Sequence, residues 1–189
     1  GPNLIKGIQL EGQRVLGHPE IFARHYYVDD VDEVILVDSV ASLFERPLNT
    51  EVISRIASEI FVPLTVIGGV RDMHDIDQAF NAGADRVGIN TGAVLNPNLV
   101  AEAASVYGSQ SIVGSVESFS SGGRHYEAWT KCGREPSGLD VLEWCHRLED
   151  LGVGELLVTS INRDGLGLGF DTELLRDVCL HASVPVVGS

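Results

Sequence analysis

Two short sequence matches with the same spacing constrain the fold of this chain most. Val31-Asp32-Glu33, which precedes an apolar run, recurs as Val153-Gly154-Glu155, and Val62-Pro63 recurs as Val184-Pro185. From 31 to 153 and from 62 to 184, the offset is the same 122 residues. Because both matches stand at the same point of a strand–helix alternation, they indicate a doubled structural unit.

The alternation itself predicts a parallel sheet. Short runs rich in β-branched residues are followed by amphipathic helical patterns, and the runs are nearly continuous in apolar character, as strands covered on both faces are. Strands that alternate with helices in this way form parallel sheets with right-handed crossovers. The predicted strands are Glu33–Asp38, Leu64–Ile67, Arg86–Ile89, Ser111–Val116, Glu155–Ser160 and Pro185–Val187.

Residue types at the ends of the helical patterns predict where several helices begin and end. Asp72 and Asp171 are expected N-caps, Thr50 is expected to open a helix, and Gly108 is expected to end one. The segment 117–134 departs from the alternation, because a pair of glycines within it predicts a hairpin.

Extending the repeat beyond the chain predicts a closed barrel. The strand at Ser111 should have a counterpart near −11, before the chain begins, and the strand at Arg86 should have one near 208, after it ends. Eight strands and a doubled unit of about 244 residues fit the roughly 250 residues of a (β/α)8 TIM barrel. We therefore expect residues 1–189 to form a single α/β domain, an incomplete (β/α)8 barrel without its first and last strands. A doubly wound sheet is the alternative, although no Gly-x-Gly-x-x-Gly motif supports a dinucleotide site.

The charge balance restricts the ligands. The chain has 27 acidic and 13 basic residues and a net charge of −14, which argues against nucleic acid or an anionic membrane as a partner. A bound phosphate would therefore be held mainly by backbone N–H groups and helix dipoles. Cys132, Cys145 and Cys179 form neither a disulfide framework nor a metal-binding pattern, so we expect a reducing cytoplasm and no metal or cofactor.

In a barrel of this kind the active site lies at the carboxyl ends of the strands. Asp38 and Glu117 end two of the predicted strands, where a buried carboxylate is costly unless it is paired or hydrogen-bonded. Both are candidate catalytic residues for that reason. For Asp38, a carboxylate that caps a nearby loop is an equally favoured interpretation.

Glycines and small polar residues at other strand ends suggest anion binding. Thr65 with Gly68-Gly69 lies at one strand end and Asn90-Thr91 at the next, and the loop Asp164–Gly169 leads toward a helix N-terminus. Glycine permits close backbone approach to an anion, and a helix N-terminus offers N–H donors. Two such clusters at related positions of the repeat predict two phosphate sites. The alternative is that the glycines only turn the chain from strand to helix.

The chain also resembles a known family, the cyclase subunit of imidazole glycerol phosphate synthase. The similarity runs from Leu4 to Ser189 and is carried by LIKGIQL, ILVDSVAS, LTVIGGVRD, GADRVGINTGAVLNP, YGSQSIV and LLVTSINRDGLGLGFD. It implies a two-fold pseudo-symmetric (β/α)8 barrel and a lyase of histidine biosynthesis. Such a subunit takes ammonia from a glutaminase partner. It converts a bisphosphorylated ribulosyl aminoimidazole carboxamide substrate to imidazole glycerol phosphate and releases an aminoimidazole carboxamide ribotide.

The resemblance implies roles for individual residues. Each step of the family's reaction moves protons, so two carboxylates on opposite sides of the substrate act as general acid and base. Both are aspartates in the family; the first falls before Gly1, and the second position is Glu117 here. Lys6 corresponds to a catalytically important loop lysine, and Asp38 to a polar strand-end position. The matching substrate-binding and phosphate-binding positions are Thr65, Gly68, Gly69, Asn90, Thr91, Thr159, Asp164 and Gly165.

At the opposite mouth of the barrel, the resemblance implies a route for ammonia. Glu33, Arg86 and Glu155 match three members of a charged ring through which ammonia enters in the family. The alternative is a set of salt bridges that only stabilise the barrel, which is the usual role of that face.

Other functions fit parts of the sequence. Glu117 is one methylene longer than the family's aspartate, which would suit a paralogue that acts on another sugar phosphate. A sister sugar-phosphate isomerase would share the barrel and its phosphate sites without needing an ammonia partner. A non-catalytic fragment of the barrel would self-associate through its unpaired sheet edges.

Overall fold

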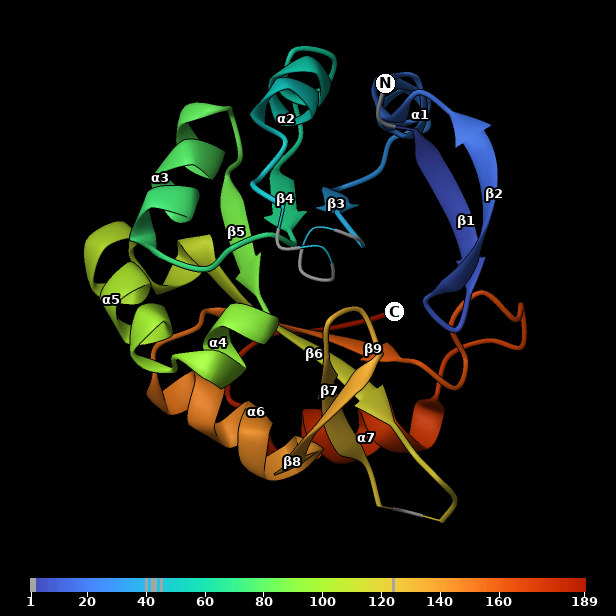
Figure 1. Ribbon diagram of the computed structural model, residues 1–189, viewed down its shortest axis with the longest axis vertical. Helices are drawn as coiled ribbons and strands as arrows, with labels where there is room; N and C mark the ends of the chain where they lie inside the picture. Colours follow the sequence, from blue (N-terminus) through green and yellow to red (C-terminus); the bar gives the residue numbers. More distant parts are fainter. Residues whose placement is uncertain (1–2, 40, 42–43, 45, 124) are drawn as a thin grey trace.

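The computed structural model describes residues 3–39, 41, 44, 46–123 and 125–189 (Figure 1). Six parallel strands form one curled sheet in the order β10-β9-β6-β5-β4-β3. Their bounds are β3 Val34–Val37, β4 Leu64–Ile67, β5 Arg86–Ile89, β6 Ile112–Phe119, β9 Glu155–Ser160 and β10 Val186–Gly188.

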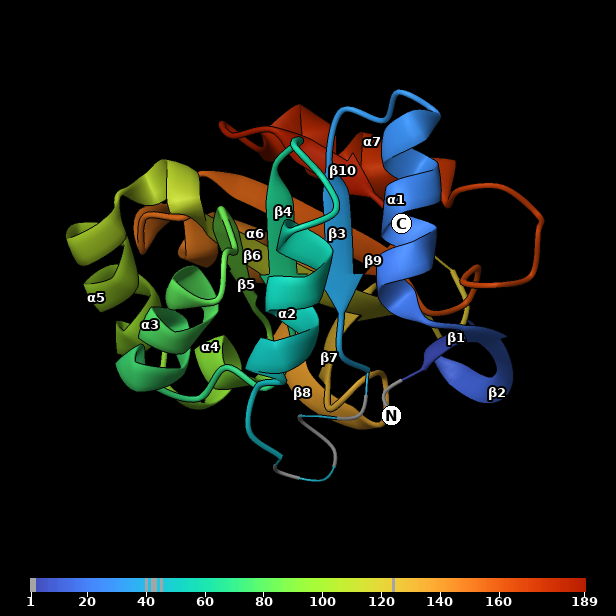
Figure 2. The ribbon, with the colours of Figure 1, turned by 90° about the horizontal axis from the view of Figure 1, so that it is seen from above.

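Helices cover the outer face of this sheet, as Figures 1 and 2 show from two directions. The predicted caps Asp72 and Asp171 each accept a backbone hydrogen bond three residues on, and Gly108 ends its helix. Thr50 opens its helix as predicted, with Asn49 as the cap. The helices are α1 Pro19–Val28, α2 Thr50–Ala57, α3 Met73–Asn81, α4 Thr91–Leu95, α5 Asn98–Tyr107, α6 Val141–Asp150 and α7 Thr172–His181, with a 3-10 turn, η1, at Ser109–Ser111.

The core has two layers, which explains why the strands are apolar on both faces. The larger layer lies between the sheet and the helices and includes Trp144 of α6 and Val116 of β6. The smaller layer lies inside the curl, where Ile67, Val113 and Leu157 pack together. Successive residues of each strand therefore enter different layers, as the pleat of a strand requires.

The arrangement confirms an incomplete (β/α)8 barrel. Within the described residues, β3 and β10 lie at the two ends of the strand order, and each pairs with one neighbouring strand. These are the two edges at which the repeat predicts further strands. The predicted bounds of β4, β5 and β9 are confirmed, whereas β6 runs on to Phe119 because a hairpin extends it.

Two antiparallel hairpins lie outside the barrel pattern. The predicted one joins β6 to β7 (Glu127–Thr130), which pairs in turn with β8 (Glu135–Asp140), while Arg124 lies outside the described residues. The other, β1 (Leu4–Ile8) with β2 (Glu11–Gly17), was not predicted. The tip of the β1–β2 hairpin contacts the loop between β9 and α7, where the backbone N–H of Gln9 donates to the carbonyl of Asp164 at 2.9 Å.

Candidate active site

Most of the predicted strand-end residues meet in one cleft. It lies where β3, β4, β5 and β6 end, so side chains far apart in the sequence face each other there. The cleft is lined by Asp38, Gly68, Gly69, Asn90, Thr91 and Glu117 of the predicted set, and also by Cys132.

Glu117 of β6 lines the cleft. It lies on β6 directly beside Thr159 of β9, and its Oε2 accepts a hydrogen bond from the backbone N–H of Gly133 at 2.8 Å. Burial raises the pKa of Glu117 to about 7, although the Gly133 N–H and the Asn90 amide favour the charged form. A carboxyl group with a pKa near neutrality can both accept and donate a proton at physiological pH.

Asp38 follows β3 directly and lines the same cleft. Its Oδ1 accepts a hydrogen bond from the backbone N–H of Ala41 at 3.0 Å, which is the loop-capping arrangement expected as an alternative. The two interpretations are compatible here, because a capping bond to one oxygen leaves the carboxylate at the cleft.

Gly68 allows β3 and β4 to approach closely where they end. Its φ of +105° is unfavourable for other residues, and a Cβ atom at this position would collide with the backbone carbonyl oxygen of Asp38. The contact gives the glycine a packing role, whether or not it also lies against an anion.

Asn90 and Thr91, which follow β5, form hydrogen bonds with the β7–β8 hairpin. The Asn90 side chain donates to the carbonyl of Trp129 at 3.3 Å, and the Thr91 hydroxyl accepts from the backbone N–H of Lys131 at 3.0 Å. The predicted anion ligands therefore also have protein partners.

Of the predicted residues that do not line the cleft, Lys6, Asp164 and Gly165 lie at the β1–β2 hairpin. Asp164 and Gly165 lie against the β1–β2 hairpin: Asp164 Oδ2 accepts from the N–H of Leu10 at 2.9 Å, and a Cβ on Gly165 would collide with the carbonyl of Gly7. Lys6 lies in β1 of that hairpin, exposed and opposite Arg14. The hairpin therefore brings Lys6 and the β9–α7 loop into one neighbourhood without placing Lys6 in the cleft.

The structure corrects the predicted position of Thr65. It is the second residue of β4, and its buried hydroxyl donates to the carboxylate of Glu33 at the amino-terminal end of the sheet. A four-residue strand is long enough to separate the two mouths, so Thr65 belongs to the mouth opposite Glu117.

The three predicted gate residues lie together at that amino-terminal mouth. Nη1 of Arg86 is 3.1 Å from Oε2 of Glu33 and 3.0 Å from Oε2 of Glu155. Burial raises the pKa of Glu155, Arg86 opposes that change, and the charge of Glu33 adds to it. One guanidinium therefore bridges two carboxylates, with Thr65 bonded to one of them.

The turn after β7 is a part of the site that was not predicted from the sequence. Cys132 in this turn lines the cleft, and Gly133 donates to Glu117. Burial, followed by the nearby charge of Glu117, raises the pKa of the Cys132 thiol to about 12, which disfavours the nucleophilic thiolate. The only available signal was the hairpin itself, which did not indicate where its far end would lie.

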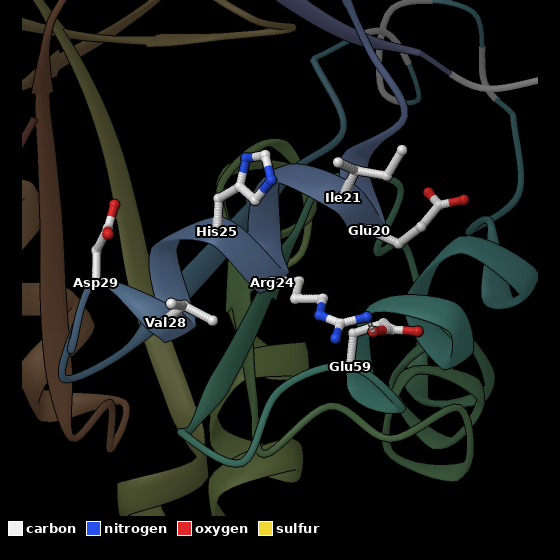
Figure 3. Close-up of a pocket in the computed structure, with 7 residues that line it drawn as sticks. All are labelled: Glu20, Ile21, Arg24, His25, Val28, Asp29 and Glu59. Carbon is white, nitrogen blue, oxygen red and sulfur yellow. Dashed lines mark hydrogen bonds and ion pairs between the residues drawn. The ribbon is translucent and has the colours of Figure 1, made fainter.

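A larger hollow of about 510 Å³ runs along α1 and contains none of the predicted residues. Figure 3 shows its lining, with Arg24 directed toward Glu59; their closest N–O distance is 3.5 Å. Exposed side chains of Ile21 and Val28 contribute its apolar part. It is a surface groove without converging reactive groups.

In the described part of the chain, no three or more His, Cys, Asp or Glu side chains cluster so that they could hold a metal ion. No helix in the same part of the chain has the length and apolar character needed to cross a membrane.

Fold and site together define a protein of the (β/α)8-barrel class, with a carboxyl group of raised pKa at the carboxyl mouth and an ion-paired cluster at the amino-terminal mouth. The model of the family described as "Histidine biosynthesis protein" matches residues 3–189. The chain belongs to this family, and the resemblance to the cyclase subunit of imidazole glycerol phosphate synthase is confirmed.

Curated relatives named "Imidazole glycerol phosphate synthase subunit HisF" match almost the whole chain. The protein from Legionella pneumophila is 44% identical over 189 residues, which cover 100% of this chain and 89% of that protein. The protein from Methanopyrus kandleri is 40% identical over 204 residues, covering 98% of this chain and 75% of that protein. The protein from Pyrobaculum aerophilum is 41% identical over 186 residues, covering 98% and 73%.

Proposed function

We propose that this chain acts as the cyclase subunit of imidazole glycerol phosphate synthase. It would combine ammonia with a bisphosphorylated ribulosyl aminoimidazole carboxamide substrate to give imidazole glycerol phosphate and an aminoimidazole carboxamide ribotide. The observation that carries the proposal is the placement of Glu117 at one mouth of the curled sheet and of the Glu33–Arg86–Glu155 cluster at the other.

The reaction requires proton transfers that Glu117 can perform. Ammonia adds to a substrate carbonyl, water leaves, and ring closure is accompanied by cleavage of a C–N bond. Each of these steps needs a proton to be delivered or removed, and a carboxyl with a pKa of about 7 can do either. We assign Glu117 this role, with Asp38 as a polar contact in the same cleft and Lys6 as a contact from the β1–β2 hairpin.

The two phosphate groups would be held at separate loops. Gly68, Gly69, Asn90 and Thr91 line the cleft and offer backbone N–H groups, a hydroxyl and an amide. The loop with Asp164 and Gly165, which follows Thr159 and leads to α7, would hold the other phosphate. Backbone donors suit a chain with net charge −14, in which cationic side chains are scarce.

Ammonia would enter between Glu33, Arg86 and Glu155. The ion pairs there lie at the amino ends of β5 and β9, the mouth opposite Glu117. We infer that a glutaminase subunit docks over this mouth and delivers ammonia. Two further expectations stay predictions: a cytoplasmic location, and self-association of residues 1–189 through the edges β3 and β10.

The direct test is an assay of the full-length gene product with the bisphosphorylated substrate and free ammonia. The proposal predicts equal amounts of imidazole glycerol phosphate and aminoimidazole carboxamide ribotide. A folded protein that forms neither would overturn it. Capture of a glutaminase by the same protein separates the proposal from a sugar-phosphate isomerase, which has no use for ammonia.

A further inference from the structure

The main chain of the β7–β8 hairpin forms hydrogen bonds with three side chains of the candidate active site. The carbonyl of Trp129 accepts from Asn90 at 3.3 Å, the N–H of Lys131 donates to Thr91 Oγ1 at 3.0 Å, and the N–H of Gly133 donates to Glu117 Oε2 at 2.8 Å. Trp129, Lys131 and Gly133 are every second residue of this segment. One short segment therefore ties the ends of β5 and β6 together at the cleft.

The turn that presents the Gly133 N–H is strained. Lys131, Cys132 and Gly133 have φ values of +51°, +58° and +69°, so two residues other than glycine adopt the left-handed conformation. That conformation is unfavourable for residues that carry a Cβ atom. It persists only where the surroundings fix it, and the N–H of Arg134, which donates to the carbonyl of Thr130 at 3.0 Å, closes the turn.

We infer that the Lys131–Gly133 turn is a positioning element for Glu117, and that Thr91 acts on Glu117 through this turn. The hydroxyl of Thr91 holds Lys131, and the turn then directs the Gly133 N–H at the carboxylate. The inference deepens the proposed function, on which it rests, because it gives Thr91 a role beyond contact with a phosphate.

The positioning has an electrostatic consequence. A backbone N–H that donates to a carboxylate stabilises the charged form, so losing the Gly133 bond would make Glu117 harder to ionise. One neighbouring titratable group in the turn is the Cys132 thiol, whose pKa is also affected by the charges of Arg134, Asp164 and Asp38. The ammonium of Lys131 is paired with Glu135 at 3.0 Å.

Nuclear magnetic resonance of the intact, unmodified protein tests the Gly133 bond without any need for turnover. The chemical shift of the Gly133 amide proton is followed against pH, and Glu117→Gln serves as the control. We expect the shift to move with a midpoint near the pKa of Glu117 and the movement to vanish in Glu117→Gln. A Gly133 signal that is flat in both proteins would overturn the inference.

The same titration in Thr91 variants tests the second part. Thr91→Val should raise the midpoint by about one pH unit, as expected for the loss of a hydrogen bond worth about 1.4 kcal/mol. Thr91→Ser, which keeps a hydroxyl, should restore it. Thr130→Val is the matched control, because the Thr130 hydroxyl donates to the carbonyl of Glu135 at 3.3 Å, and the substitution keeps the Thr130 carbonyl that closes the turn.

A different result separates the alternatives. If Thr91→Val weakens substrate binding while the Gly133 titration is unchanged, Thr91 is only a phosphate contact and the positioning role is wrong. If Thr91→Val does not fold, the titration of the unmodified protein against Glu117→Gln still decides whether Gly133 positions Glu117. Lack of turnover by a protein that shows the expected titrations would overturn the proposed function and leave the positioning role standing.

Discussion

Arg86 and Glu117 lie on neighbouring strands at opposite mouths of the curled sheet. The register of β5 and β6, in which Val87 pairs with Ile112, places Glu117 about six residues further along than Arg86. That separation corresponds to roughly 20 Å along the strand direction. Under the proposed function, ammonia would travel between these two residues, past the core layer of Ile67, Val113 and Leu157.

Replacing Arg86 should affect the use of glutamine more than the use of free ammonia. Arg86→Met leaves the Glu33 and Glu155 carboxylates without their shared cation and disturbs the entry mouth. We expect glutamine-dependent turnover of the complex to fall about tenfold, or about 1.4 kcal/mol, with little change in ammonia-dependent turnover. Steady-state assays with each nitrogen source measure both.

Arg24→Met is the matched control for this substitution. Arg24 forms a surface ion pair with Glu59 at 3.5 Å and lies outside the gate cluster. It should leave both activities unchanged. Equal losses with glutamine and with ammonia in Arg86→Met would show that Arg86 only stabilises the barrel.

Replacing Glu117 should slow the chemical step without loss of fold. Glu117→Gln keeps the shape of the side chain and an oxygen that can accept from Gly133, but it cannot exchange a proton. A positioned acid/base group contributes on the order of 10²–10⁴ in rate, so turnover with ammonia should fall by that factor. Retention of most of the activity would remove Glu117 from the proton-transfer role.

The same variant should be more stable than the unmodified protein at alkaline pH. Glu117 has its pKa raised from 4.5 to about 7 in the folded state, so its contribution to stability is present below pH 4.5 and is lost as the pH rises to about 7. At pH 8, Glu117→Gln should gain on the order of 2 kcal/mol, after allowance for partial solvent access. Urea unfolding at pH 5 and at pH 8 measures the difference, which should shrink at the lower pH.

Gly68 offers a test of the close approach between β3 and β4. Gly68→Ala puts a methyl group against the carbonyl of Asp38, so we expect about 3 kcal/mol of destabilisation from backbone strain and overlap together. Gly122→Ala is the control, since Gly122 also has positive φ, +131°, but has open space around it. It should cost about 1–2 kcal/mol, the strain alone. Equal losses in urea unfolding would mean that the contact with Asp38 is unimportant.

The barrel could be predicted because its signals are periodic and repeated. The strands are apolar on both faces because each face packs in a different core layer: Val116 lies in the larger layer and Val113 in the smaller one. The shared offset of 122 residues then placed the strands in a larger order. The β1–β2 hairpin has neither signal, because within the described residues its two strands pair with each other alone, and its tip is held by Asp164.

The site could be predicted only in part. Strand-end residues such as Glu117 and Asn90 follow from the topology, which brings the ends of parallel strands to one mouth. Thr65 was misplaced because its position within a short strand decides which mouth it faces. The Gly133 bond could not be foreseen, since it depends on a left-handed turn at Lys131 and Cys132, residue types that give no sign of that conformation.

The most direct measurement of the central claim, that ammonia passes from the Arg86 mouth to Glu117, uses labelled glutamine. The complex of this subunit with its glutaminase partner is supplied with glutamine carrying ¹⁵N in the amide, with excess unlabelled ammonium in the solution. The account predicts that the imidazole ring of the product retains most of the ¹⁵N. A label diluted to the level of the bulk ammonium would contradict it, because the ammonia would then have entered from solvent.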